Sequence, residues 1–217
     1  MTSEPAVRID APTSARSELY GLLADALSFP DQAFHVRVTA GAFRDDVEDL
    51  VAELPFSLPV AVDFAGLAEA GEYIDFQAEY IRLFEVGAIR PPCPLYGGEW
   101  GPARKRTMEE VLRFYRFFGM KVDERARELP DHVTIELEFL QVLAFEEGMA
   151  RATGVDTAPL LRAQRDFLER HPARWWRLLE RKLATQNPAR FYAALASLTG
   201  AFLAGDLAYV RGLLEGR

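Results

Sequence analysis

Apolar residues recur at helical spacing along most of the chain. Leu19, Leu22, Leu23, Ala26 and Leu27 follow one another at intervals of one, three or four positions, as on one face of an α-helix. The same pattern predicts further helices over residues 31–41, 43–54, 76–84, 107–119, 131–153, 156–171, 173–183, 188–202 and 207–214. No stretch alternates apolar and polar residues for long enough to predict a β-strand. The sequence therefore predicts an all-α fold, a single-domain bundle of about 8–10 helices.

Particular residues mark where these helices begin and end. Thr107 and Glu110 form a T-x-x-E capping box, which predicts a helix start at Thr107. Gly119 suits the position just after that helix, because glycine readily adopts left-handed backbone angles. Gly205 and Asp206 predict a break before a last short helix. We expect a disordered segment over residues 1–13 and one all-helical domain over residues 14–217.

The composition is that of an ordinary globular protein, with 49% hydrophobic and 27% charged residues. Cys93 is the one cysteine, which excludes an internal disulfide and a multi-cysteine metal site and is typical of a reducing compartment. The polar N-terminus does not resemble a signal peptide, and the longest weakly polar run, residues 193–204, is too short to span a bilayer. We expect a cytoplasmic protein without membrane insertion.

The charge is negative overall and unevenly distributed. A net charge of −8 argues against nucleic-acid binding, whose affinity comes mainly from neutralised phosphates. Residues 42–80 carry ten acids and one base, whereas residues 161–190 carry eight bases and three acids. The acidic stretch is suited to a basic ligand such as an arginine-bearing peptide. The simpler interpretation is two solvated helix faces of opposite sign.

Common catalytic motifs are absent from the sequence. It contains no G-x-x-x-x-G-K phosphate loop, no G-x-G-x-x-G after a strand, no H-E-x-x-H and no serine nucleophile elbow. His35, His132 and His171 are far apart in the chain. We therefore expect a protein that is not an enzyme and that holds no metal and no resident cofactor.

Residues 85–101 interrupt the helical pattern with four glycines and three prolines. A loop of this length is long for a compact domain and is typical of a functional segment. Tyr96 and Trp100 are rigid aromatics that together could form a wall for an apolar peptide. The alternative is a loop that its aromatics merely attach to the core. We expect Cys93, between prolines, to be an inert small hydrophobe.

A second candidate site is the Leu-Pro-Asp-His sequence that ends at His132. Asp131 is suited to cap the helix that follows, because its side chain can accept the unpaired N–H groups of the first turn. His132 and Glu136 are four residues apart and so share a helix face. This pair could form a pH-sensitive ion pair, a polar contact for a ligand, or half of a metal site, and only two ligands are visible.

The order of these motifs resembles the TorD/DmsD/NarJ family of redox-enzyme maturation chaperones. The resemblance covers residues 73–147, from a helix reading EYIRLF through the proline-rich loop to LPDH and then IELEFL. The run PPCPLYGG is most similar to the branch that serves ethylbenzene dehydrogenase, dimethylsulfide dehydrogenase and selenate or chlorate reductases. Gly97, Gly98, Glu99 and Trp100 depart from the family, many of whose members have a serine there.

The resemblance implies an all-helical cytoplasmic chaperone without turnover. It would bind the N-terminal region, often a twin-arginine signal, of the apo catalytic subunit of a molybdopterin oxidoreductase and hold it until the cofactor is inserted. The residues expected from the family motifs to contact this peptide are Tyr80, Leu83, Phe84, Pro94, Tyr96, Asp131 and His132. Trp100 and Glu136 are added on physical grounds, as an apolar wall and an arginine partner.

Other functions stay open at the level of the sequence. One is a nitrate-reductase-type assembly factor whose client is not exported, and another is a helical ligand-binding regulator domain. A third is a helical hydrolase that uses His132 and Glu136. Direct binding of the molybdenum cofactor or a guanine nucleotide, and the choice between a monomer and a dimer, are also left open.

Overall fold

The computed structural model describes residues 9–101, 103–121 and 128–216, and within these residues the fold is all-α. The α-helices are α1 (Ala11–Ala26), α2 (Gln32–Thr39), α3 (Ala42–Glu53), α4 (Tyr73–Tyr80), α5 (Arg104–Phe117), α6 (Val133–Ala152), α7 (Ala158–Arg170), α8 (Pro172–Ala184) and α9 (Arg190–Glu215). Three short helical turns are η1 (Phe64–Ala68), η2 (Ile81–Glu85) and η3 (Gly97–Trp100). The predicted all-helical bundle is confirmed.

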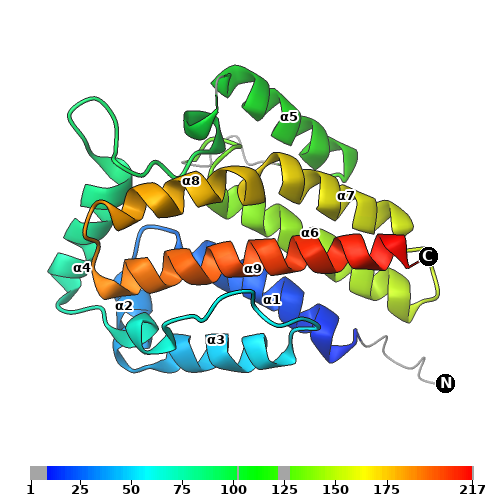
Figure 1. The fold of residues 1–217 in the computed structure, drawn as a ribbon, viewed down its shortest axis with the longest axis horizontal. Helices are drawn as coiled ribbons and strands as arrows, with labels where there is room; N and C mark the ends of the chain where they lie inside the picture. Colours follow the sequence, from blue (N-terminus) through cyan, green and yellow to red (C-terminus); the bar gives the residue numbers. More distant parts are fainter. Residues whose placement is uncertain (1–8, 102, 122–127, 217) are drawn as a thin grey trace.

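Helix α9 runs the length of the molecule, and the other helices are arranged around it (Figure 1). In that view α7 and α8 lie above α9, and α3 lies below it. Helix α1 makes its most extensive contacts with α6, and α9 packs on α7, α8 and η1. Helix α5 lies at the top of the view and packs against η3, so the loop that contains η3 is held between α5 and α8.

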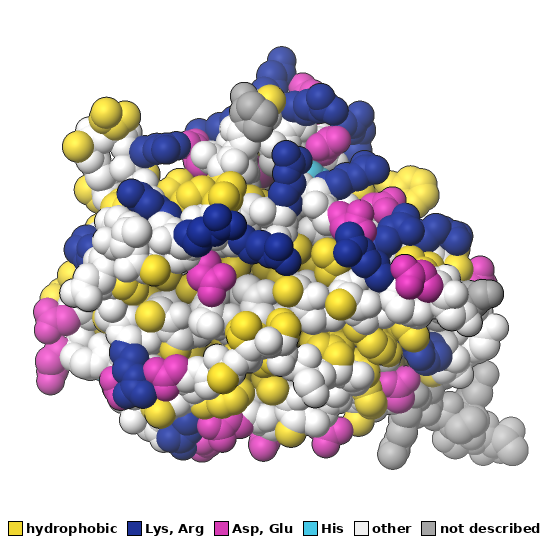
Figure 2. All heavy atoms as spheres, viewed as in Figure 1, with side chains coloured by type: hydrophobic (Ala, Val, Ile, Leu, Met, Phe, Trp, Pro, Cys, Tyr) yellow, Lys and Arg dark blue, Asp and Glu magenta, His cyan; other side chains and the backbone are white. Residues whose placement is uncertain are grey.

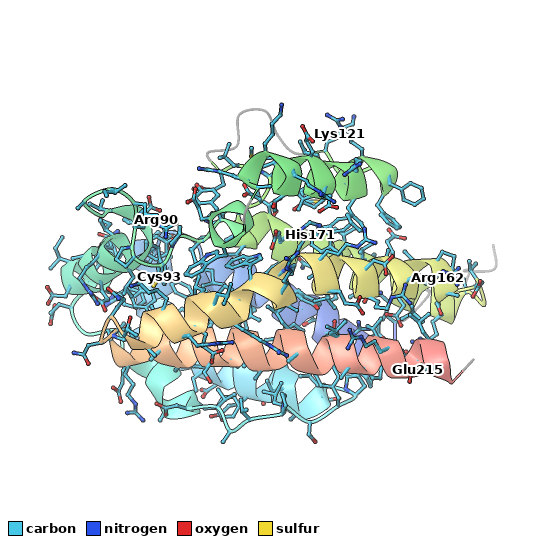
Figure 3. All side chains as sticks on the ribbon, turned by 45° about the horizontal axis from the view of Figure 1, so that its top comes forward. Arg90, Cys93, Lys121, Arg162, His171 and Glu215 are labelled. Atoms are coloured by element: carbon cyan, nitrogen blue, oxygen red, sulfur yellow. The ribbon has the colours of Figure 1, made fainter. Side chains whose placement is uncertain are left out.

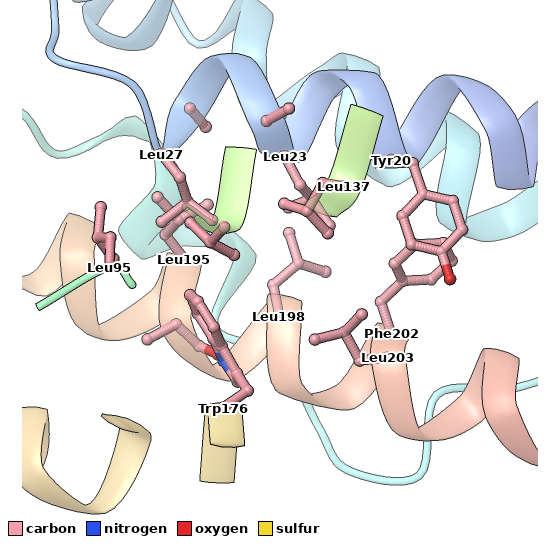
Figure 4. Packing of buried hydrophobic residues seen from close by; sticks show 14 of the residues in the cluster. Tyr20, Leu23, Leu27, Leu95, Leu137, Trp176, Leu195, Leu198, Phe202 and Leu203 are labelled. Carbon is pink, nitrogen blue, oxygen red and sulfur yellow. The ribbon is translucent and has the colours of Figure 1, made fainter. Parts of the chain in front are cut away.

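A single cluster of buried apolar side chains extends from Leu19 in α1 to Leu203 in α9. In its centre Leu23, Leu137 and Leu198 meet from α1, α6 and α9 (Figure 4). Leu95, from the glycine- and proline-rich loop, is 1% exposed and belongs to the same cluster. Because full burial of a side chain of this size contributes about 1.5–3 kcal/mol, Leu95 anchors the loop to the core.

A buried ionic network joins four helices. Arg16 of α1 donates to Asp206 of α9 (2.6 Å), to Glu147 of α6 (2.7 Å) and to Gln164 of α7 (2.6 Å). Tyr20 donates to the second oxygen of Asp206 at 2.6 Å. Burial of these charges is tolerable because each one has charged and hydrogen-bonding partners.

The predicted break at Gly205 and Asp206 is wrong, since α9 continues through both residues. The Asp206 carboxylate forms an ion pair with Arg16 and does not cap a helix. Gly205 lies against Phe56, and a Cβ atom there would be 2.6 Å from the ring. These two residues serve tertiary contacts, which the local sequence does not reveal.

Two predicted helix starts also differ from the structure. Helix α5 begins at Arg104, one turn before the expected capping box, and the Thr107 hydroxyl donates back to the carbonyl of Ala103. Helix α1 begins at Ala11 rather than Ser14, because Asp10 caps it by accepting the N–H of Thr13 at 2.9 Å. The rest of the segment expected to be disordered, residues 1–8, lies outside the described residues.

Helix α9 is long and apolar enough to cross a membrane by length and composition alone. The helix is longer than the weakly polar run of residues 193–204 that was evident in the sequence. Of its most apolar window, 61% is buried inside the protein, where it faces α7, α8 and η1. This burial is what a central core helix requires, so the length is weak evidence for a membrane span.

Candidate functional site

The predicted site begins where α4 passes into the π-helical turn η2. Tyr80, Leu83 and Phe84 are all buried there, and the Tyr80 hydroxyl donates to the carbonyl of Leu27 at 3.0 Å. The carbonyl of Leu83 accepts the N–H of Cys93 at 2.9 Å, which closes the base of the protruding loop that carries Arg90 (Figure 3). Burial raises the pKa of the Cys93 thiol to about 11, consistent with an inert side chain.

The loop is joined to the start of α6 by backbone hydrogen bonds. Gly97 N–H donates to the carbonyl of Asp131 at 2.8 Å, and Val133 N–H donates to the carbonyl of Leu95 at 2.8 Å. The Asp131 carboxylate accepts the N–H of Gly98 at 3.0 Å. The loop and the Leu-Pro-Asp-His motif therefore form one structural unit. The residues that these hydrogen bonds join are 33 to 38 positions apart in the chain.

The sequence predicts that Asp131 caps α6, and this prediction is wrong. His132 is the N-cap residue, and its ring accepts the N–H of Thr134. Asp131 is fully buried, and burial raises the pKa of its carboxyl group, opposed by the hydrogen bond from Gly98. Its role in this structure is to hold the loop, not to face solvent.

The predicted pairing of His132 with Glu136 is not present among the described residues. The His132 ring lies edge-on to Tyr96, with 4.8 Å between ring centroids, and its Nε2 is 3.9 Å from Glu128. Burial lowers the pKa of His132 to about 4, so the ring is neutral at physiological pH. His132 therefore supports Tyr96 rather than pairing with the next turn of its own helix.

Glu136 faces α8 instead. Its Oε2 accepts the indole N–H of Trp175 at 3.1 Å, and its Oε1 has no partner within the described chain. Burial raises the pKa of this carboxyl group well above its usual range, which favours its neutral form. Gly97 lies directly above this pair, because a Cβ atom on it would be 2.8 Å from the Trp175 nitrogen.

Tyr96 is half-buried, with the Arg104 guanidinium over its ring at 5.8 Å from the centroid and the carboxylates of Glu128 and Glu85 nearby. Its hydroxyl donates to Glu128, and burial together with the carboxylates of Glu128 and Glu85 raises the Tyr96 pKa. The ring of Phe29, 46% exposed, packs edge-on against Tyr80 nearby at 5.5 Å. We use the name Tyr96 surface for five exposed or half-buried residues: Phe29, Glu85, Tyr96, Glu128 and Leu129.

Trp100 lies on a different side of the loop. Its indole N–H donates to the carbonyl of the buried Pro94 at 2.9 Å, and its ring lines a groove between α5 and α8. Tyr96 is not part of that groove. Trp100 therefore contributes to this groove and Tyr96 does not, and a common wall of the two aromatics stays a prediction.

Of the nine residues predicted to contact a peptide, two reach the surface, Tyr96 and Trp100. The buried ones are Tyr80, Leu83, Phe84, Pro94, Asp131, His132 and Glu136. Glu85, Glu128 and Phe29 were not among the residues predicted from the sequence. Glu128 directly precedes the Leu-Pro-Asp-His motif, so the motif itself could have indicated this residue. Phe29 follows α1 and is distant from the motif in the chain, so no local sequence feature links the two.

Comparison with known proteins identifies the family. The family profile described as nitrate reductase delta subunit matches residues 43–180. The chain belongs to this family. The resemblance to TorD/DmsD/NarJ chaperones inferred from the loop and the Leu-Pro-Asp-His motif is confirmed at this level.

Three relatives of this chain carry the name assembly chaperone. The perchlorate reductase assembly chaperone of Dechloromonas aromatica is 32% identical over 92% of this chain and 91% of its own. The selenate reductase assembly chaperone of Thauera selenatis is 39% identical over 62% and 74%. The dimethyl sulfide dehydrogenase assembly chaperone of Rhodovulum sulfidophilum is 32% identical over 90% and 80%.

A solved structure has the same fold. It is described as a putative redox enzyme maturation protein from Archaeoglobus fulgidus, and it superposes with a TM-score of 0.56 over 93% of this chain and 99% of its own. At 18% sequence identity the likeness concerns the fold alone.

Proposed function

We propose that the protein is a maturation chaperone for one molybdenum enzyme. It binds the N-terminal, twin-arginine signal region of the apo catalytic subunit in the cytoplasm and holds that subunit until the cofactor is inserted and export can begin. The observation that carries this proposal is the rigid pairing of the 93–101 loop with residues 128–133, which presents the Tyr96 surface. Family membership supports the general role, because relatives named above are assembly chaperones.

The Tyr96 surface suits the two chemical parts of such a signal. Glu128 and Glu85 supply carboxylates, and arginine binds carboxylates through charge-assisted hydrogen bonds. Phe29, Tyr96 and Leu129 supply exposed apolar area for the hydrophobic part of the peptide. Residues 42–80, acidic in the sequence, add to the negative field that attracts a basic segment.

The buried predicted residues have an indirect role in this proposal. Asp131, through Gly98, fixes the loop, and His132 supports the Tyr96 ring. Tyr80, Leu83, Phe84, Pro94 and Glu136 hold the elements beneath them. Substitution of these residues affects binding through the shape of the surface, whereas substitution of Tyr96 removes a contact.

The action proposed is stoichiometric and without turnover. Binding is tested by calorimetric titration of the protein with a synthetic N-terminal peptide of the molybdenum enzyme subunit encoded beside its gene. We expect one-to-one binding that Tyr96→Ala and Glu128→Gln each weaken about tenfold, which is about 1.4 kcal/mol. Glu109→Gln, which changes the same charge on the exposed side of α5, is the matched control and leaves the affinity unchanged.

The family description favours one alternative, an assembly factor of the nitrate-reductase type whose client is not exported. The same titration separates the two. If the client's N-terminal peptide has a twin arginine and the signal is recognised, replacing both arginines with alanine weakens binding. A client peptide without a twin arginine that binds equally well supports the alternative. Absence of any binding by either peptide contradicts the proposed recognition of an N-terminal segment.

A further inference from the structure

The groove between α5 and α8 has a strongly basic lining. Its volume is about 720 Å³, within the range of roughly 300–1,000 Å³ that is typical of ligand sites. One acid, Glu110, lines it beside five arginines, Arg106, Arg170, Arg174, Arg177 and Arg181. Figure 2 shows the corresponding band of basic side chains across the upper part of this face. A local excess of positive charge in a protein with a net charge of −8 indicates an anionic occupant.

The arginines are arranged as a stripe rather than a point. Arg174, Arg177 and Arg181 follow i, i+3, i+7 on α8 and so extend over about 10 Å of one helix face. Arg170 continues the stripe at the end of α7, and Arg106 faces it from α5. None of the five forms an ion pair with another described residue, and all five are exposed. Their donors are therefore available to carboxylates spaced along an extended ligand.

The floor of the groove between these arginines is apolar. Leu178 is 42% exposed there, and Trp100 and Trp175 contribute ring surface. Both indole N–H groups are already engaged, with Pro94 and Glu136. The tryptophans thus offer apolar contact and no further hydrogen bond, which suits a segment that mixes acidic and apolar residues.

The backbone at the end of the groove does not form a phosphate cradle. Phosphate sites commonly use N–H groups of a glycine-rich loop or of a helix N-terminus. Here the N–H groups of Gly97 and Gly98 both donate to Asp131, and α8 starts with Pro172, which has no N–H. The start of α5, which also lines the groove, has no side-chain cap. The five arginines are nevertheless spread along the groove rather than gathered around that one point, which favours a carboxylate-bearing polypeptide over a compact phosphate group.

We propose that the α5–α8 groove docks an acidic, partly apolar segment of the client polypeptide, separate from the basic N-terminal segment bound at the Tyr96 surface. This inference rests on the proposed function in taking the client as the source of the segment. The groove shares no residue with the Tyr96 surface, and it is lined mainly by arginines whereas the Tyr96 surface contains Glu85 and Glu128. The two are therefore suited to different parts of the same partner.

The test uses the full chain and fluorescence anisotropy with a labelled synthetic peptide that alternates pairs of glutamates with single leucines. We expect saturable binding that Arg177→Glu/Arg181→Glu weakens at least about tenfold, as loss of close charge pairs does. The matched control is Arg116→Glu/Arg162→Glu, which changes the net charge equally at exposed positions outside the groove. Circular dichroism establishes that both double variants are folded.

Each outcome decides the proposal. Equal weakening by both double variants, or no effect of either, overturns it, because the peptide then responds to overall charge or binds elsewhere. Displacement of the peptide by inorganic pyrophosphate or guanosine triphosphate at much lower concentration overturns it in favour of an organic phosphate. Titration of Arg177→Glu/Arg181→Glu with the client's N-terminal peptide separates the two proposals. The affinity for this peptide is unchanged if the groove is a distinct site. If neither the parent protein nor any variant binds the N-terminal peptide, the result counts against the proposed function alone.

Discussion

Gly98 occupies a position where both its N–H group and its missing side chain matter. A Cβ atom there would lie 2.8 Å from the Asp131 carboxylate and 2.7 Å from Arg104. Gly98→Ala is therefore expected to displace the loop, weaken N-terminal peptide binding about tenfold and leave the helical content unchanged. Gly101→Ala is the matched control, since no atom lies within 4 Å of its Cβ position. Calorimetric titration that finds equal affinity for the two variants contradicts the account of the loop.

His171, between α7 and α8, predicts a dependence of stability on pH. Burial, with Arg170 and Arg174, lowers the pKa of His171 from 6.5 to about 4, and neither ring nitrogen has a partner among the described residues. Between about pH 4 and pH 6.5, His171 binds a proton in the unfolded chain but not in the folded protein. Stability from this group is therefore fully present above about pH 7 and is lost, by about 3 kcal/mol, as the pH falls to about 4.

The variant that tests this is His171→Phe, which keeps a ring against Phe114 and Phe167. Thermal unfolding measured from pH 4.5 to pH 7.5, within the window set by the His171 pKa, should give a flatter profile for the variant than for the parent protein. Glu136 contributes with the opposite sign in both proteins, so it cancels in the comparison. An unchanged slope in the variant would mean that His171 titrates freely in the folded state.

At the scale of elements, alanine substitution is expected to have opposite effects on stability at two of the three glycines in α9, Gly205 and Gly212. Gly205→Ala introduces a Cβ 2.6 Å from Phe56 and should destabilise the protein by about 1–3 kcal/mol through overpacking. Gly212→Ala meets no atom within 4 Å and should stabilise the same helix by about 0.5–1 kcal/mol through helix propensity. Urea unfolding of both variants measures the difference. Stabilisation by both substitutions would refute the packing of Phe56 on α9.

The helices themselves could be predicted from the sequence because periodic apolar positions are a local signal. Gly119 has φ +74° after α5, as its position predicted. The start of α5 was misplaced because the Thr107 hydroxyl donates to the carbonyl of Ala103 within the helix instead of capping it. The continuity of α9 was missed because Asp206 pairs with Arg16, which is distant in the chain. The candidate site is similar: its loop was evident, whereas the burial of Asp131 and Glu136 depends on Gly98 and on Trp175, from distant segments.

At the scale of the whole molecule, Arg16 connects α1 to α6, α7 and α9 in one buried network. Arg16→Met removes the ion-pair partner of buried Asp206 and leaves Glu147 with Arg151 alone, and it is expected to cost about 3–5 kcal/mol. Arg37→Met is the matched control, because the Arg37–Asp46 pair is largely exposed and should contribute less than about 1 kcal/mol. Urea unfolding gives both values. A loss below about 1 kcal/mol for Arg16→Met would contradict the importance of the network.

The most direct test of the chaperone role is capture of the full client. The purified protein is mixed with the apo catalytic subunit, with the cofactor-loaded subunit, and with an apo-subunit that lacks its N-terminal segment, and each complex is quantified by size-exclusion chromatography with light scattering. The account predicts a one-to-one complex with the intact apo-subunit and little complex with the other two. Equal capture of all three forms, or no capture of the intact apo-subunit, would contradict it.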